Sequence, residues 1–239
     1  MSQQIKVKGV ADIVFLLDAT GSMAPCISAV KENIAAFITS LTTKDANDQS
    51  VVKDWRVKIV GYRDFEYTDY PAIVDNPFVT SVEEARSHLA KLEAAGGGDE
   101  PESLLEGLYR VATMPETGLN EPLNPDCWRH RSEGRRFVIV FTDATYKARM
   151  SEPRGGTVDD VINAMMNSRI ILYVYAPEPF ECYETLREMD KSEWYPVPVP
   201  EGSTPQKALE EFTSSRENFQ KILDVLAKTI TQTAAIPPL

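Results

Sequence analysis

The sequence predicts an α/β fold built on one open, mostly parallel, doubly wound sheet of about six strands, with helices on both faces. Two observations carry this prediction. Strand-like and helix-like segments alternate along the chain, which is the pattern of parallel sheets. Two of the strand-like segments, residues 11–18 (ADIVFLLD) and 136–143 (RFVIVFTD), are near-continuous apolar runs that end in Asp, as expected of strands buried on both faces.

The first half of the chain has clear boundaries between its expected elements. Strands are expected at residues 11–18, 55–62 and 72–79, and helices at 24–41, 81–93 and 101–114. Pro25 suits the first turn of its helix, and Pro101 suits the start of the helix that it opens. Pro71 and Pro77 favour an edge position for residues 72–79. Ser81, with Glu84 three residues later, forms a capping box.

The second half continues the alternation around one irregular stretch. Strands are expected at residues 136–143, 170–175 and 194–199, and helices at 157–169, 181–190 and 205–231. The last of these is a helical tail whose apolar stripe consists of Phe212, Phe219, Leu223 and Leu226. Residues 115–134 are rich in Pro, Gly and Asn and are expected to form a long inserted surface loop. No linker is evident, so residues 1–239 are expected to form a single domain.

The composition excludes several classes of function. Lys and Arg total 25 and Asp and Glu total 36, which gives a net charge of −11 and argues against a nucleic-acid partner. No apolar run reaches the roughly 18–20 residues that span a bilayer. Three widely spaced cysteines favour a reducing compartment. Since neither a signal peptide nor a transmembrane segment is recognised in this sequence, a cytoplasmic location is expected. Two histidines are too few for a His-rich zinc site.

The sharpest polar residues follow the predicted strands. Such loops meet at the carboxyl edge of a parallel sheet, where ligand sites lie. Asp18–Ser22 and Thr142–Ala144 lie at the ends of predicted strands, and Gly97–Glu102 is a third polar loop, at the start of the helix expected at 101–114. If they share one edge, five oxygen-bearing side chains converge, namely Asp18, Thr20, Ser22, Asp99 and Asp143. Oxygen ligands without His or Cys select a hard divalent cation such as Mg²⁺. Taken singly, Asp18 and Asp143 would more often be helix caps than ligands, and it is the three loops together that favour a metal site.

These motifs resemble a von Willebrand factor type A (vWA) domain, a Rossmann-like fold with a metal-ion-dependent adhesion site (MIDAS). The family pattern DxSxS, with Thr allowed in the middle, corresponds to Asp18-x-Thr20-x-Ser22. The segments DATGSM and GGGDEPE are most similar to those of the family branch that is found in hemicentins and beside alpha-kinases. The resemblance implies Mg²⁺, with Mn²⁺ or Ca²⁺ as alternatives, bound by hydroxyls of Thr20 and Ser22. It implies that Asp18 acts through a water or at the edge of the ion's first shell, and that Asp143 lies opposite and holds metal-bound water.

Asp99 departs from this pattern, since many adhesion-type members have Thr there. A third carboxylate beside the ion would partly neutralise it and weaken its attraction for an acidic residue of a partner.

Other polar residues have competing interpretations. Glu100 and Glu102 are expected in the first turn of the following helix, where the helix dipole favours acids. The basic cluster of Arg129, His130, Arg131, Arg135 and Arg136 could contact a partner or a phosphate, but a solvated loop is the favoured interpretation. Phe65, Tyr67 and Tyr70 interleave with acids after the second strand, and they are expected either on the metal-bearing edge or tucked into their loop. Cys26 and His88 are expected to be a packing residue and a helix-surface residue.

Three functions compete. The first is a non-enzymatic module that engages a protein partner through a metal ion, which bridges to a partner oxygen. The second is a haloacid-dehalogenase-like, Mg²⁺-dependent phosphatase, in which Asp18 would be the nucleophile. That class needs a second Asp where Thr20 stands and a catalytic Lys, for which Lys147 is the nearby candidate. The third is a structural subunit with a vestigial site. The sequence favours the first.

Overall fold

The computed structural model describes residues 9–42, 52–67, 69–98, 100–178, 180–215, 217–218 and 221. Its centre is a six-stranded sheet with the strand order β3-β2-β1-β4-β5-β6. The strands are β1 (Gly9–Asp18), β2 (Val52–Tyr62), β3 (Ile73–Asp75), β4 (Arg135–Phe141), β5 (Ile170–Pro177) and β6 (Ser192–Val197). All neighbouring strands pair in parallel except β2 and β3. The predicted open, mostly parallel sheet is confirmed.

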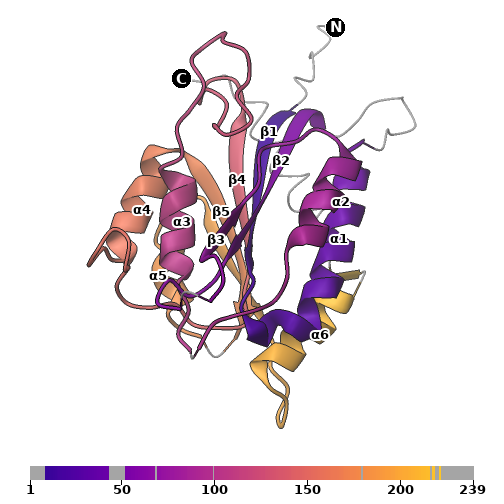
Figure 1. Ribbon diagram of the computed structural model, residues 1–239, viewed down its shortest axis with the longest axis vertical. Helices are drawn as coiled ribbons and strands as arrows, with labels where there is room; N and C mark the ends of the chain where they lie inside the picture. The colour runs from indigo at the N-terminus through magenta and orange to yellow at the C-terminus, as the bar shows by residue number, and fades with distance from the viewer. Residues whose placement is uncertain are drawn as a thin grey trace, which may run out of the picture.

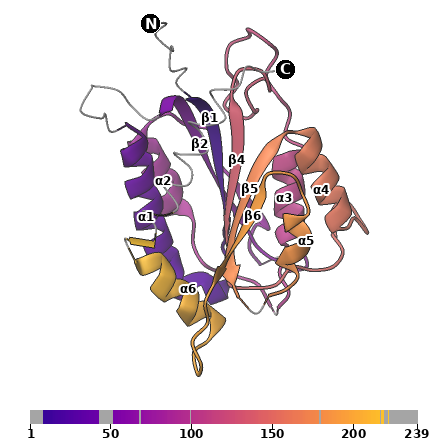
Figure 2. The same ribbon diagram turned by 180° about the vertical axis from the view of Figure 1, so that it is seen from behind.

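Helices cover both faces of this sheet, which confirms the doubly wound arrangement. The α-helices are α1 (Ala24–Thr42), α2 (Val82–Lys91), α3 (Leu104–Ala112), α4 (Val158–Asn167), α5 (Tyr183–Arg187) and α6 (Pro205–Ser214). Helices α1, α2 and α6 lie on one side of the sheet, and α3, α4 and α5 lie on the other (Figures 1 and 2). A short 3₁₀ helix, η1 (Gly21–Met23), joins β1 to α1. Within the described ranges, none of the helices has the length and apolar character to cross a bilayer.

Each face of the sheet has its own hydrophobic core. Phe15 and Phe37 meet edge-to-face at 5.6 Å beneath α1. On the opposite face, Leu108 of α3 and Met165 of α4 are buried against the sheet. A third, smaller cluster joins the start of α1 to α6 and consists of Met23, Cys26, Val197, Ala208 and Leu209. Cys26 is fully buried there, and burial raises the pKa of its thiol, so it is a packing residue as expected.

The expected start of α3 is wrong. Pro101 does not open the helix, which begins at Leu104 with Ser103 as its N-terminal flanking residue. The backbone of Glu102 is instead committed to a parallel bridge with the loop after β4. Its N–H donates to the carbonyl of Thr145 at 2.9 Å, and its carbonyl accepts from the N–H of Lys147 at 3.0 Å. Because these bonds hold the chain extended, Glu100 and Glu102 lie outside the helix.

The expected edge strand at 72–79 is shorter than predicted. Only β3 (Ile73–Asp75) pairs regularly with β2, and it is antiparallel. Beyond Pro77 the chain returns to β2 through a single bridge between Val79 and Val57.

The expected helical tail at 205–231 is described only in part. Helix α6 ends at Ser214, and Phe212 packs against the core. Phe219, Leu223 and Leu226 lie outside the described residues.

The expectation of a solvated basic loop is wrong for two of its arginines. At the amino end of the sheet, Asp12 of β1 is 1% exposed and is bound by Arg56 at 2.9 Å and by Arg129 at 2.8 Å. Arg136 is buried too and pairs with Glu116. A buried carboxylate without a counter-charge is costly, so Arg56 of β2 and Arg129 of the 115–134 loop provide it. The loop therefore closes this end of the sheet, where it projects beyond β4 in Figure 1.

Removing Asp12 should be strongly destabilising, because the change leaves Arg56 and Arg129 buried without their shared carboxylate. We expect Asp12→Ala to lower the free energy of unfolding by about 3–5 kcal/mol, as measured by urea denaturation. Asp126→Ala, at an exposed position of the same loop, should change it by less than about 0.5 kcal/mol. Equal effects of the two substitutions would contradict a stabilising role for the buried network.

Candidate functional site

The candidate site lies where β1 and β4 end, at the lower edge of the sheet in Figure 1. These two strands are neighbours in the sheet, with Leu17 paired to Phe141. After β1 the chain turns into η1 and α1 on one face, whereas the chain reaches β4 from α3 on the other. This is a switch point in the strand order, where ligands bind in open α/β sheets. It brings Asp18 and Asp143 to the same place.

Asp18 is fully buried and accepts four hydrogen bonds. One carboxylate oxygen accepts from the backbone N–H of Thr20 at 3.0 Å and from its hydroxyl at 2.6 Å. The other accepts from the hydroxyl of Tyr62 at 3.2 Å and that of Thr142 at 2.8 Å. Burial raises the pKa of Asp18, and these four donors oppose the shift. Asp18 is thus held rigidly by neutral groups alone.

A chain of oxygen atoms runs from Asp18 to Asp143. The hydroxyl oxygens of Thr20 and Ser22 are 3.1 Å apart, and the Ser22 hydroxyl donates to Asp143 at 3.1 Å. The second carboxylate oxygen of Asp143, Oδ2, is buried and has no hydrogen-bond partner among the described residues. Burial and then the charge of Asp18 raise the pKa of Asp143 to about 7. The structure therefore brings Asp18, Thr20, Ser22 and Asp143 together.

While both carboxylates are ionised, two hydroxyl protons serve three contacts in this chain of oxygens, because each hydroxyl carries one proton. Either hydroxyl could donate across the 3.1 Å contact between the Thr20 and Ser22 oxygens. A cation bound by both oxygens fits the oxygen-only chemistry of Mg²⁺.

A glycine-rich loop forms the opposite wall of the site. Gly96 and Gly97 have φ angles of 71° and 75°, which L-residues rarely adopt. The carbonyl of Gly96 accepts from the N–H of Gly21 at 2.8 Å, so this loop touches the turn after β1. The fifth predicted ligand, Asp99, follows in this loop and lies outside the described residues.

Between these walls lies a cavity of about 280 Å³. Thr20 and Ser22 line it on one side and Gly97 on another, and Gln206 of α6 also reaches it.

Glu102 is a site residue that the sequence did not reveal. It is 5% exposed, lines the cavity, and its Oε2 atom has no hydrogen-bond partner in the described part of the chain. A Cβ atom at Gly97 would lie 3.0 Å from its Oε1 atom. Burial, followed by the charges of Asp18 and Asp64, raises the pKa of Glu102 to about 8. The sequence analysis missed this role because Pro101 favoured a helix start, which placed Glu102 in the first helical turn.

Lys147 anchors the loops around Glu102. Its ammonium group binds both carboxylate oxygens of Asp64, at 2.6 and 2.8 Å, and Glu66 at 2.9 Å. Ser103 also donates to Asp64, at 3.3 Å. The loops after β2 and β4 and the segment before α3 are thereby tied together on the rim. The charge of Lys147 is already used in this network.

The described residues alone do not form a carboxylate cage. Within the described ranges, no group of three or more His, Cys, Asp and Glu side chains is arranged to hold a metal ion. Asp18, Glu102 and Asp143 also form no ion pair with any described cation. What the site offers is two hydroxyls, buried carboxylates, and carboxylate oxygens without partners.

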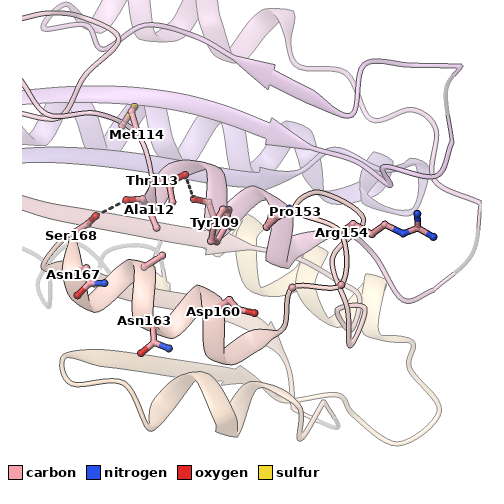
Figure 3. A pocket seen from close by; sticks show the side chains of 13 residues that line it. Tyr109, Ala112, Thr113, Met114, Pro153, Arg154, Asp160, Asn163, Asn167 and Ser168 are labelled. Atoms are coloured by element: carbon pink, nitrogen blue, oxygen red, sulfur yellow. Dashed lines mark hydrogen bonds between the residues drawn. The ribbon is translucent and has the colours of Figure 1, made fainter.

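A larger open groove of about 700 Å³ lies between α3 and α4 (Figure 3). Tyr109 and Met114 border it on the α3 side, and Asn163 and Asn167 on the α4 side. None of the described candidate ligands lines this groove, so the rim cavity is the better site despite its smaller size.

Comparisons with known proteins agree with the fold, and the matched region includes most of β1, the strand that leads to Asp18. Residues 12–118 match the profile of the von Willebrand factor A domain. The chain is 25% identical over 179 residues to the alpha-protein kinase vwkA of Dictyostelium discoideum. That match covers 71% of this chain and 25% of the kinase, so the chain spans about a quarter of this relative's length. The predicted resemblance to the alpha-kinase-associated branch is confirmed.

Solved structures with the same fold include a mussel byssus protein and a bacterial pilus adhesin. Proximal thread matrix protein 1 from the mussel byssus superposes with a TM-score of 0.58 at 12% identity, over 93% of this chain and 49% of that one. The pilus adhesin SpaC of Lactobacillus rhamnosus GG gives a TM-score of 0.57 at 15% identity, over 96% of this chain and 31% of the adhesin. At such identities the similarity is one of fold.

The burial of Glu102 predicts a pH dependence of stability in EDTA. The folded-state pKa of about 8 lies above its ordinary value of 4.5, so the folded protein favours the protonated form. This contribution to stability is complete below pH 4.5 and is lost as the pH rises through 8. We expect Glu102→Gln to gain stability relative to the parent protein as the pH rises between the two limits, by about 1.4 kcal/mol for each unit by which folding raises the pKa of Glu102.

Urea denaturation across this pH range measures the effect, with Glu152→Gln at an exposed position as the control. A stability difference between the parent and Glu102→Gln that is constant with pH would contradict the buried, uncompensated state of Glu102.

Proposed function

Because this chain carries a von Willebrand factor A domain, we propose that it is a non-enzymatic protein-interaction module whose binding depends on a divalent cation. The cation site is the rim cavity, and the partner contributes an oxygen there. The acidic composition supports a protein partner over a nucleic acid. A cytoplasmic location stays a prediction.

The observation that carries this proposal is the convergence of the Thr20 and Ser22 hydroxyls with Asp143, whose buried Oδ2 atom has no hydrogen-bond partner among the described residues. The two hydroxyl oxygens and a carboxylate oxygen of Asp143 are the groups that would hold the ion. Asp18 keeps its four hydrogen bonds and orients Thr20, as the predicted indirect role requires. A bound Mg²⁺ would supply positive charge for the buried carboxylates and an open position for a partner oxygen.

Glu102 adds a third carboxylate at the cavity wall, and Asp99, which lies outside the described residues, stays a predicted ligand. With several carboxylates near one divalent ion, the loaded site has little net positive charge. The partner oxygen is therefore bound mainly by coordination rather than by long-range attraction.

The phosphatase alternative has weaker support. A nucleophilic Asp18 would need a free carboxylate oxygen, whereas both of its oxygens accept two hydrogen bonds. Lys147, the candidate catalytic lysine, is bound to Asp64 and Glu66. If the parent protein hydrolyses an aryl phosphate and Asp18→Asn abolishes this activity, the phosphatase function is supported and the interaction proposal is rejected.

The proposal predicts that divalent cations stabilise the protein. After EDTA treatment, titration with Mg²⁺, Mn²⁺ or Ca²⁺ should raise the midpoint of thermal unfolding in a saturable manner. At a concentration of 100 Kd, the stabilisation should be about 2.7 kcal/mol. Ser22→Ala removes an exposed hydroxyl with little structural cost and should weaken the effect at least about tenfold in metal concentration. Asp18→Ala should abolish it.

Ser28→Ala is the matched control, since Ser28 is an exposed serine one turn into α1; it should titrate like the parent. If folded Ser22→Ala protein responds to the cations like the parent, the ion does not bind in this cavity. The absence of any response in the parent would favour the third alternative, a structural subunit with a vestigial site.

A further inference from the structure

Two exposed tyrosines flank the rim cavity. Tyr67 and Tyr70 are 42% and 47% exposed. A Cβ atom built at Gly98 would lie 1.8 Å from the Tyr67 ring, and one at Gly96 would lie 3.1 Å from the Tyr70 ring. The glycine-rich loop therefore separates the two rings from the cavity by the thickness of one backbone. Tyr67 and Tyr70 therefore lie on the rim and are not tucked into their loop, the other location that the sequence left open.

The surface around these rings is acidic. Asp69, between the two tyrosines, and Glu100, beyond the glycine-rich loop, are both exposed. Neither forms an ion pair with another described residue, and Glu100 accepts only from Thr145. Glu66 is exposed as well, although it pairs with Lys147.

The cations packed against this surface are already engaged. Arg63, buried beneath Tyr70, donates to the backbone carbonyls of Ala19, Pro71 and Glu93. Lys147 is held by Asp64 and Glu66. The exposed part of the surface thus presents aromatic faces and carboxylates.

We infer that Tyr67, Asp69, Tyr70 and Glu100 form the docking surface for a basic segment of a protein partner, which lies beside the cavity while one of its oxygens enters it. This inference rests on the proposed function and specifies its partner. Arg or Lys side chains of such a segment would stack on the tyrosine rings and pair with Asp69 and Glu100. Exposed tyrosines are well suited to this role, because they bury a large area at low entropic cost.

An independent observation indicates that the adjoining cavity takes a ligand. Glu102 is 5% exposed and lines the cavity with an oxygen atom that no described residue satisfies. The acidic, aromatic surface and this incomplete polar site are continuous through Gly96–Gly98, which line the cavity on one side and support the tyrosines on the other.

Fluorescence anisotropy with defined peptides tests the inference. The probes are a labelled peptide that alternates Arg and Gly and a peptide of equal length that alternates Glu and Gly, each measured with saturating Mg²⁺ and with EDTA. We expect the basic peptide to bind and the acidic peptide not to bind, with affinity falling as salt is added. Tyr70→Ala and Asp69→Asn should each weaken binding by about threefold or more.

Two controls separate a docking surface from general attraction to an acidic protein. Asp159→Asn makes the same charge change at an exposed position on α4, and Leu123→Ala removes an exposed apolar side chain from the 115–134 loop. Both should bind the basic peptide like the parent. Equal loss in Asp69→Asn and Asp159→Asn, preference for the acidic peptide, or no binding of the basic peptide would overturn the inference.

The metal titration distinguishes this outcome from failure of the proposed function. Tyr70→Ala should retain the Mg²⁺-dependent rise in the unfolding midpoint. If the midpoint rises but the basic peptide is not bound, the cation site stands and the basic partner is rejected. If the midpoint does not rise, the proposed function itself fails.

Discussion

The parallel pairing of β1 with β4 is the constraint on which the candidate site depends. Residues 11–17 of β1 pair with residues 135–141 of β4, although more than 100 positions separate them in the sequence. A shift by one residue would exchange the two faces of a strand, and here each face packs into a different core, with Phe15 and Phe137 in one and Leu16 and Val138 in the other. Asp18 and Asp143 meet only in this register. The turn after β1 then positions Thr20 and Ser22 between them.

The buried carboxylates near the two ends of β1 differ in the charge of their partners. Asp12 and Asp18 are 1% and 0% exposed. Asp12 is neutralised by two arginines, whereas Asp18 receives only neutral donors, and Asp143 and Glu102 nearby also form no ion pair with a described residue. Uncompensated buried charge is costly. A cation from solution would therefore neutralise the buried carboxylates of the rim, as the two arginines neutralise Asp12 at the opposite end of β1. This contrast supports the metal proposal beyond the likeness of the motifs, and the exposed carboxylates beside Tyr67 and Tyr70 extend the acidic rim outwards.

The sequence predicted the sheet well because apolar runs such as residues 11–18 and 136–143 have one physical interpretation. It failed where a residue's partner is distant. Pro101 suggested a helix start, yet the bridge to Tyr146 that holds Glu102 extended depends on a loop 44 positions away. Arg129 was expected in a solvated loop, although Asp12 within an apolar strand indicated a need for a buried cation. Of the site, Asp18, Thr20, Ser22 and Asp143 were predicted to converge and do so. Glu102 required the tertiary structure.

The most direct test of the central claim is anomalous diffraction from crystals grown with Mn²⁺. The account predicts one strong anomalous peak within coordination distance of the Thr20 and Ser22 hydroxyls and on the Asp143 side of the cavity, and no such peak in Ser22→Ala crystals. A fully occupied ion elsewhere on the molecule with an empty rim cavity, or no ordered ion at saturating Mn²⁺, would contradict it.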